Sequence, residues 1–420
     1  MKHIKVCTPI LLTVMLIVSI SGCASSLSGS KAAHAVDLMK NISPGTVDVK
    51  PIDDGFIENM ADLSIELFKR SGANGENSLI SPLSVILALT MTANGADGET
   101  LTQMETMLGG DISISDMNDY LHTFVNSLMS TEKTRLNIAN SIWFRDDEDN
   151  LKVEPDFLKL NADYYGAAAF KAAFDDQSVK DINNWVETST DGMIDEILVE
   201  IDPLSMLFII NAIVFDAYWA DVYNEDQVGK GDFTNIQGIV QNVDYLHSSE
   251  SIYLDDGMAT GFRKFYSGHG YSFIALLPNE GISVSSYVES LTGTGFLEML
   301  ENSRGVLVHA SMPKFEFENN INMNDVLIDL GIPDAFYDCT ADFSKMATCT
   351  LGNLYISKVI HKTFISVDEL GTKAGAATLV DMQCESAPDE FEIVDLDRPF
   401  VFAIVDARNI PIFIGTLLTV

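Results

Sequence analysis

The stretch from Glu369 to Thr378 constrains this chain most, because its composition and its side-chain pattern predict different structures. Its small residues offer little side chain to bury, and the polar segment that follows Glu385 is typical of an exposed loop. Yet small or apolar residues alternate along one face as in a strand, namely Thr372, Ala374, Ala376, Thr378, Val380 and Met382. This combination favours a segment that is exposed in one state and inserted into a sheet in another.

A series of short segments accompanies this stretch in a fixed order. The segments lie at residues 77–85, 94–96, 136–144, 182–186, 211–219, 275–278, 312–315, 341–344 and 398–400. Together with residues 361–378 (HKTFISVDELGTKAGAAT), they resemble the serpin family over about residues 53–420. No single segment decides this resemblance, which depends on the order of the whole series.

The resemblance implies a serpin fold, with a large central β-sheet, additional sheets, about eight to nine helices and an exposed reactive-centre loop at about residues 369–397. The residues alone predict an α+β domain, because the apolar segments do not alternate regularly between strand and helix patterns. The strands are expected at residues 136–144, 207–215, 271–277, 306–310, 356–367, 400–405 and 410–418. We expect one domain over 53–420.

Four helices can be predicted from periodicity and from end signals. The first covers about residues 53–70, where apolar residues recur at helical spacing. The second begins at Ser81 and Pro82, and its apolar residues on all sides predict that it is buried. Thr100 with Gln103 predicts a capping box for the third, and the fourth ends at Leu330 and Gly331.

The resemblance also implies a mechanism. A serine protease attacks the loop, its serine forms an acyl bond, and the cleaved hinge then inserts into the main sheet before the bond is hydrolysed. The residues that match the hinge are Glu369, Gly371, Thr372, Ala374, Gly375, Ala376, Ala377 and Thr378. Leu370 and Lys373 stand where many members carry an acid, but neither has the inward parity, so we expect little loss of inhibition.

The position of the scissile bond follows from counting along the family's loop. The count gives Glu385-Ser386, with Cys384-Glu385 as the alternative and Met382 and Ala387 as weaker candidates. The expected target is then an elastase-like protease or one that cleaves after acidic residues. Trypsin-like targets are disfavoured because residues 379–397 contain no Lys or Arg.

Two further groups of residues match family positions. Ser81, Ser84, Asn211 and His361 match the shutter, a polar cluster beneath the opening sheet, and Trp219 matches the breach, where the loop first enters. For His361 alone, a core histidine with satisfied hydrogen bonds would be the simpler interpretation. Trp143 and Trp185 are more simply core residues.

Other functional classes fit less well. The chain has no Gly-x-Ser-x-Gly, His-Glu-x-x-His, Cys-x-x-Cys or P-loop motif, so we expect neither an enzyme nor a metal or cofactor site. A non-inhibitory serpin-like binding or carrier protein remains the alternative. The net charge of -36 repels nucleic acids and polyanionic activators, so the expected partner of this monomer is a protease.

The N-terminal residues predict export. Residues 1–22 form a signal peptide in which an apolar run follows two lysines, and residues 20–23 (ISGC) resemble a bacterial lipobox that would lipidate Cys23. An ordinary cleaved signal or an N-terminal membrane helix is the alternative. Residues 23–52 are expected to be a flexible tether, so the protein would be anchored at the cell surface or secreted. Cys339 and Cys349 could pair or remain free thiols.

Overall fold

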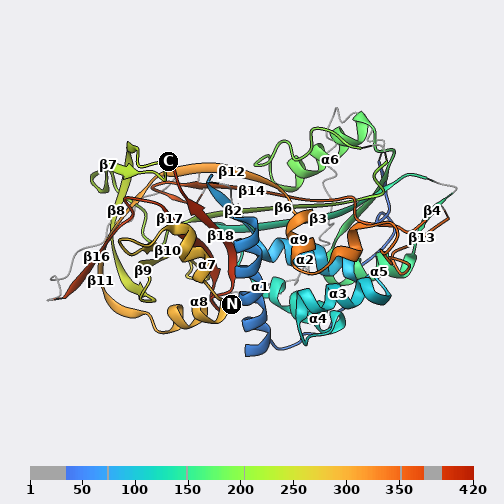
Figure 1. The fold of residues 1–420 in the computed structure, drawn as a ribbon, viewed down its shortest axis with the longest axis horizontal. Coiled ribbons are helices and arrows are strands. Elements are labelled where there is room, and N and C mark those ends of the chain that lie inside the picture. The colour runs from blue at the N-terminus through green and yellow to red at the C-terminus, as the bar shows by residue number, and fades with distance from the viewer. Residues whose placement is uncertain (1–34, 73–74, 148–149, 203, 351, 373–389) are drawn as a thin grey trace, which may run out of the picture. The chain divides into compact units, whose positions relative to one another are not determined.

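The computed structural model describes residues 35–72, 75–147, 150–202, 204–350, 352–372 and 390–420. These residues form nine α-helices and three β-sheets, which confirms the predicted α+β class and the number of helices (Figure 1). The helices are α1 (Asp54–Ser71), α2 (Pro82–Ala93), α3 (Gly98–Gly109), α4 (Ile114–Ser127), α5 (Pro155–Tyr165), α6 (Asp176–Ser189), α7 (Val284–Ser290), α8 (Gly293–Glu301) and α9 (Asn324–Asp329). Two short 3-10 helices span Glu225–Gln227 and Pro333–Phe336.

The first large sheet has seven strands. In spatial order they are β1 (Val36–Asp37), β5 (Ala168–Ala172), β3 (Thr134–Arg145), β6 (Leu207–Tyr218), β15 (Gly371–Thr372), β14 (Lys358–Val367) and β12 (Phe315–Asn322). Figure 1 views this sheet along its edge, with α6 on one face and α2 and α3 on the other. Both faces are therefore covered, which explains why the central strands are continuous apolar runs.

The second large sheet has nine strands. They are β16 (Phe391–Asp395), β11 (Arg304–Pro313), β8 (Val240–Asp255), β9 (Ala259–Phe265), β10 (Tyr271–Pro278), β17 (Phe400–Asp406), β18 (Pro411–Leu417) and β2 (Ser78–Ile80), with β7 (Val228–Thr234) paired to β8. A small sheet joins β13 (Ala347–Cys349) to β4 (Leu151–Val153). All seven strands predicted from the sequence are present.

Helix α2 forms where the sequence predicts it. The Ser81 hydroxyl accepts a hydrogen bond from the Ser84 N–H, and Pro82 occupies the first turn. Every residue of α2 is buried, so the helix lies inside the core as its composition predicts. No helix in the described part of the chain is long and apolar enough to cross a membrane.

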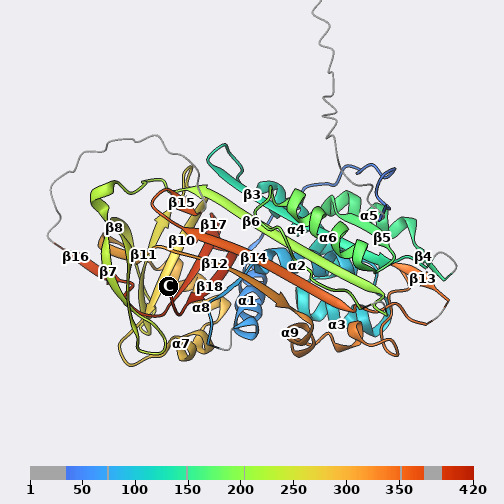
Figure 2. The same ribbon diagram turned by 90° about the horizontal axis from the view of Figure 1, so that it is seen from above.

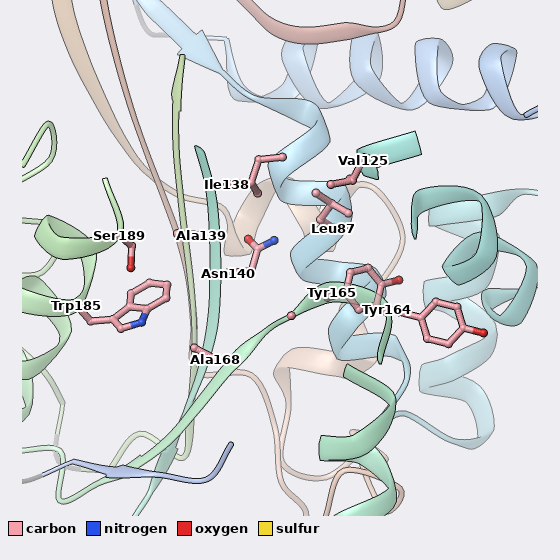
Figure 3. A pocket seen from close by; sticks show the side chains of 11 residues that line it. Leu87, Val125, Ile138, Ala139, Asn140, Tyr164, Tyr165, Ala168, Trp185 and Ser189 are labelled. Carbon is pink, nitrogen blue, oxygen red and sulfur yellow. The ribbon is translucent and has the colours of Figure 1, made fainter. Parts of the chain in front are cut away.

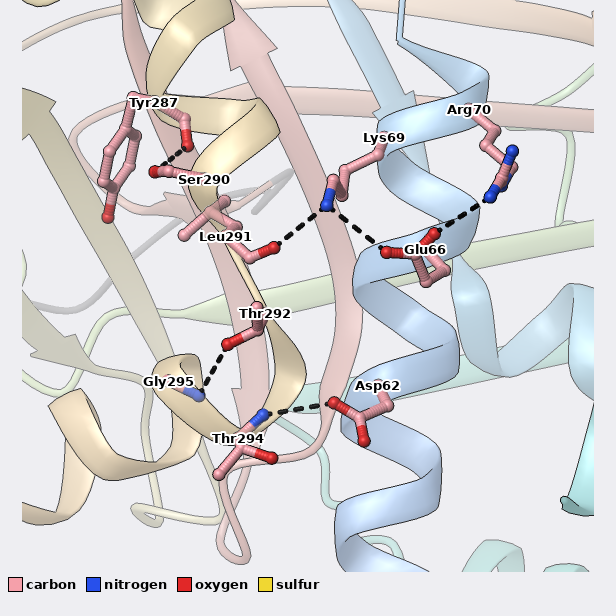
Figure 4. A network of polar contacts seen from close by, with 10 residues as sticks. All are labelled: Asp62, Glu66, Lys69, Arg70, Tyr287, Ser290, Leu291, Thr292, Thr294 and Gly295. Carbon is pink, nitrogen blue, oxygen red and sulfur yellow. Dashed lines mark hydrogen bonds and ion pairs between the residues drawn. The ribbon is translucent and has the colours of Figure 1, made fainter.

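The polar face of helix α1 forms hydrogen bonds with the segment around the start of α8. Lys69 donates to Glu66 and to the carbonyl oxygen of Leu291, at 3.3 and 3.2 Å. Asp62 accepts from the N–H of Thr294 in α8 at 3.2 Å (Figure 4). These contacts fix α1 against the segment that leads into α8.

The capping box predicted at Thr100 and Gln103 is wrong. Helix α3 begins at Gly98 after Asp97, and both predicted capping side chains accept hydrogen bonds from elsewhere. Thr100 accepts from the N–H of Asp342 and Gln103 from the N–H of Asp334, at 3.0 and 3.1 Å. The side-chain oxygens of these two residues therefore accept hydrogen bonds from distant parts of the chain and not from the first turn of the helix, as the local pattern predicted.

Part of the predicted tether, from residue 35 onward, is hydrogen-bonded to the rest of the domain. Strand β1 pairs with β5, and the N–H of Ala35 donates to Asp181 at 3.0 Å. Farther along, the N–H of Lys50 donates to Thr123 in α4 at 3.0 Å. Ser, Gly and Pro content predicts a linker but says nothing about such backbone hydrogen bonds, which explains the difference.

Candidate functional site

The described end of the predicted hinge lies between two central strands of the seven-stranded sheet. Thr372 of β15 pairs with Ala217 of β6 on one side and with Val367 of β14 on the other. Beyond this point, β6 and β14 pair directly over Phe208–Ile213 and Lys358–Thr363. We call this junction of β6 and β14 the seam. Figure 2 shows β15 at one end of it. One end of the seam is thus already occupied by the hinge, while the rest is closed.

Both residues of β15 fit closely into the sheet. Thr372 is 2% exposed, and its hydroxyl lies 2.5 Å from the hydroxyl of Tyr266. A Cβ on Gly371 would lie 2.0 Å from the carbonyl oxygen of Ala217, so only glycine permits this approach of the two backbones. The site therefore requires glycine at 371 and favours a small polar residue at 372.

Trp219 lies directly beside the hinge. Its side chain is buried and stacks on Tyr266, with ring centroids 4.5 Å apart. Its indole N–H donates to the carbonyl oxygen of Asp368, and its backbone N–H donates to that of Leu370, both at 2.9 Å. The indole thus fixes the turn through which the chain leaves β14 and enters β15.

Charged groups surround the same turn. Lys314 donates to Glu369 at 2.5 Å, and this hydrogen bond lowers the pKa of Glu369 from its ordinary value. Burial raises the pKa of the neighbouring Asp368. Beneath Trp219, the buried ammonium of Lys264 lies 2.9 Å from Glu250 and 5.5 Å from the centre of the indole.

The predicted shutter residues form one hydrogen-bonded cluster across the seam. His361 is fully buried, its Nε2 accepts from the N–H of Ser81 at 3.0 Å, and its Nδ1 lies 2.6 Å from Asn211 Oδ1. Because a backbone N–H can only donate, the proton resides on Nδ1 and is donated to Asn211. Asn211 Nδ2 in turn donates to Ser84 and to Asn140 Oδ1.

Burial determines the protonation state of His361. Desolvation lowers its pKa to about 3, so the ring is neutral at ordinary pH. A neutral ring is also what the cluster needs, since protonation of Nε2 would leave the Ser81 N–H without its acceptor. The closed seam therefore depends on an uncharged histidine.

Several predicted site residues lie outside the described part of the chain. They are Ala374, Gly375, Ala376, Ala377 and Thr378 of the hinge, Cys384, Glu385 and Ser386 at the reactive bond, and Cys23. The thiols of Cys339 and Cys349 are free. Among the described residues, no group of three or more His, Cys, Asp or Glu side chains is arranged to hold a metal ion.

Sequence reasoning did not identify four residues of this site, namely Asn140, Tyr266, Lys264 and Lys314. The pairing of Asn140 with Asn211 across β3 and β6 is visible only when the register is known. Tyr266 and Lys264 come from β9 and its end, about a hundred residues from the hinge in sequence. The motif MPKF at residues 312–315 contains Lys314, but the pattern gave no reason to place it beside Glu369.

Comparisons with known proteins agree with this geometry. A family model described as serpin (serine protease inhibitor) matches residues 58–420. The native-state crystal structure of the thermophilic serpin tengpin is 53% identical, covers 92% of this chain and 100% of its own, and superimposes with a TM-score of 0.89. Its latent-state structure, also 53% identical, covers 89% of this chain and 100% of its own, with a TM-score of 0.79.

Two curated relatives cover most of the chain. A serpin-like protein of the archaeon Thermococcus kodakarensis is 29% identical over 97% of this chain and 96% of its own length. The leukocyte elastase inhibitor of Xenopus laevis is 29% identical over 81% of this chain and 92% of its own.

Proposed function

The chain belongs to the serpin (serine protease inhibitor) family, and we propose that it traps serine proteases irreversibly by loop insertion. A target protease would cleave the loop at Glu385-Ser386 or Cys384-Glu385 and remain attached through its acyl bond. The freed hinge would then extend β15 along the seam. The attached protease would be carried along and its active site distorted.

The position of β15 between β6 and β14 carries this proposal. Thr372 already pairs with Ala217 and Val367, so the next residues of the hinge can continue in the same register. Six residues farther along, Thr378 would face Asn211 on one side and His361 on the other. Insertion would therefore replace the direct Asn211–His361 contact with a polar threonine, which suits the hydrogen-bonding groups on both sides.

The energy balance favours insertion. The direct pairs between β6 and β14 must break, but each inserted residue gains a neighbour on both sides. At about 1 kcal/mol net per hydrogen bond, roughly ten new bonds supply on the order of 10 kcal/mol, similar to the stability of a whole domain. Such a difference can drive a step that outruns hydrolysis of the acyl bond.

We further propose that the target is an elastase-like protease or one that cleaves after acidic residues. We also propose that a lipid at Cys23 anchors the protein on the outer surface of a bacterial cell. The residues Cys384 and Glu385, together with the name of the Xenopus relative, support the first proposal. The lipobox-like residues 20–23 support the second. The chain's partner would then be a protease met outside the cell.

Replacement of the buried Thr372 tests the mechanism. Thr372→Arg places a long cation where the side chain is 2% exposed, so insertion should be blocked and the inhibitor should become a substrate. The control is Lys373→Arg, which conserves charge at a position of outward parity. Denaturing gels after mixing with an elastase or a glutamate-specific protease should show a covalent complex for the wild type and the control alone. If every protease tried yields only cleaved wild-type protein, the proposal is wrong.

A further inference from the structure

Strand β1 lies at the end of the seven-stranded sheet opposite the hinge. Figure 2 shows its neighbour β5 at one end of the sheet and β15 at the other. A row of directly paired residues crosses four strands at this end, namely Val36 of β1, Lys171 of β5, Phe144 of β3 and Leu207 of β6. We call these four residues the end row. Leu207 is the first residue of β6, so the sheet ends close to this row.

An inserted loop would leave the sheet at the end row, a step that rests on the proposed function. Because Thr372 pairs with Ala217, an antiparallel continuation of β15 would bring Met382 opposite Leu207. Glu385 would then lie three residues, or about 10 Å, beyond the row. The acyl bond to the protease would therefore lie just outside this end of the sheet.

The chain enters the domain at the same edge. Strand β1 is antiparallel to β5, and Val36 pairs closer to the end of β5 than Asp37 does. The residues before Val36 therefore lead past the end row, in the direction that Glu385 would take. The N–H of Ala35 donates to the buried carboxylate of Asp181 at 3.0 Å, which fixes this entry point.

The entry point is close enough to the expected acyl bond for one protease to reach both. At about 4.8 Å between neighbouring strands, the four spacings from β1 to an inserted loop amount to about 19 Å. A compact protein of about 200 residues is roughly 40 Å across, so its body extends about 20 Å to either side of its centre. A protease attached at Glu385 would therefore cover the place where the chain enters β1.

Strand β1 is held mainly by backbone hydrogen bonds. Both of its residues are exposed, and Val36 is 53% exposed. After the two ladder pairs with β5, the N–H of Leu38 donates to the carbonyl oxygen of Ala169 at 2.9 Å. These hydrogen bonds are fewer than the roughly ten that an inserted strand gains, so insertion can displace β1.

Strand β5, in contrast, is held by aromatic packing. Phe170 stacks on Trp143 with ring centroids 4.3 Å apart and meets Trp185 of α6 edge-on at 6.3 Å. Trp185 is only partly buried, unlike the core tryptophan that the sequence suggests, and it lies across β3 from Leu87 (Figure 3). We therefore expect β5 to stay in the sheet when β1 leaves it.

We propose that the end row is the surface on which a trapped protease rests, and that the protease displaces β1 from β5. The partner is the covalently attached serine protease, and the displaced part of the chain runs from Ala35 to Asp37. The next residues stay attached, because Met39 packs against the core and the N–H of Gly45 donates to Asp163 at 2.5 Å. A used inhibitor would thus differ from an unused one where its N-terminal segment joins the domain.

Hydrogen exchange of residues 35–38 tests the displacement on three forms of the full chain. The first is intact, the second has a loop cleaved by a metalloprotease, and the third is the covalent complex. A metalloprotease attacks with water and forms no acyl-enzyme, so the second form is inserted but carries no partner. Exchange should be slow in the first two forms and at least about tenfold faster in the complex. Equal or slower exchange in the complex than in the cleaved form would overturn the proposal.

A disulfide between β1 and β5 tests whether the displacement matters for trapping. Val36→Cys with Lys171→Cys places two thiols directly opposite each other. In the oxidised form, β1 cannot leave, and the last stage of insertion should slow. The number of inhibitor molecules cleaved per protease trapped should then rise at least about twofold, because hydrolysis of the acyl bond competes better. Reduction should restore the wild-type number.

The matched control is a second disulfide far from the end row. Asp232→Cys with Asn242→Cys joins two exposed, directly paired residues of β7 and β8, and its oxidation should change nothing. Melting temperatures identify a variant that fails to fold. If the oxidised β1–β5 variant traps proteases as its reduced form does, the proposal is wrong.

The outcomes separate this inference from the proposed function. If no covalent complex forms with any protease tried, the proposed function fails and the displacement of β1 fails with it. If complexes form while residues 35–38 remain protected, only the displacement fails and the proposed function stands.

Discussion

His361 shows how one buried side chain can make the closed sheet sensitive to acid. The ring bridges Ser81 and Asn211 across the seam and is neutral because burial lowers its pKa to about 3. In the unfolded chain the same ring has its ordinary pKa near 6.5. The unfolded state therefore binds a proton between these two values and the folded state does not.

The pH dependence of stability follows from this difference in pKa. The contribution of His361 is complete above pH 6.5 and is lost as the pH falls toward 3, at up to about 1.4 kcal/mol per pH unit. Chemical denaturation at several pH values between 4.5 and 7 gives the free energy of unfolding as a function of pH. The slope of this dependence should be shallower for His361→Gln than for the wild type. The carboxyl groups of the chain titrate in both proteins, so the difference between the two slopes isolates the contribution of His361. Identical slopes would contradict the assignment.

At the level of single residues, sequence reasoning succeeded where a residue's role is local. Ser81 caps α2 as predicted, because a cap hydroxyl needs only its own backbone. It failed at Thr100, where a distant backbone N–H competes for the hydroxyl. It also missed Asn140, whose place beside Asn211 depends on the register of two strands.

Among the elements, β15 is the shortest strand of the site and depends on a glycine. Gly371→Ala would bring a Cβ to 2.0 Å from the Ala217 carbonyl oxygen, so β15 should leave the sheet or β6 should shift. We expect a loss of about 1–3 kcal/mol in stability, as for other overpacked sites. Hydrogen exchange should be faster at the N–H groups of Trp219 and Tyr223, which donate to Leu370 and Glu369.

A matched control for this glycine is available on β11. Gly305 has no atom within 4 Å of a built Cβ, so Gly305→Ala should leave both stability and exchange close to those of the wild type. If Gly371→Ala behaves like this control, β15 does not occupy the seam in solution.

The elements that could be predicted are those with strong apolar patterns. The buried strands and α2 follow from continuous apolar runs, since both faces of the large sheet are covered. Strand β8 could not be found this way, because most of its 16 residues alternate between exposed and half-buried and many of its side chains are polar. Strand β1 has two residues, and only its pairing with β5 reveals it.

For the whole molecule, the net charge of -36 opposes the compact state through repulsion among its acidic groups. Added salt screens this repulsion, with a Debye length of about 10 Å at 0.1 M. The melting temperature should rise by roughly 2–4 °C between 0.02 and 0.3 M NaCl. KCl at equal ionic strength should give the same rise, and a fall with salt would contradict repulsion as the dominant effect.

Cleavage of the loop should stabilise the whole molecule. A gain on the order of 10 kcal/mol from an added strand predicts a melting temperature higher by roughly 10–15 °C after limited digestion at residues 384–386. Calorimetry before and after digestion measures this difference, and Thr372→Arg, which should not insert, provides the control. An unchanged melting temperature of the cleaved wild type would favour the non-inhibitory binding protein.

The length of β6 determines where a captured protease would come to rest. Because Thr372 pairs with Ala217, Met382 would face Leu207, which is the first residue of β6. The three residues from there to Glu385 would run past the end of the sheet. At about 3.3 Å per residue, the thirteen residues after Thr372 would place Glu385 roughly 40 Å from Thr372. The acyl bond would therefore come to rest at the opposite edge of the domain, and the bulk of the protease would be pressed against the surface there.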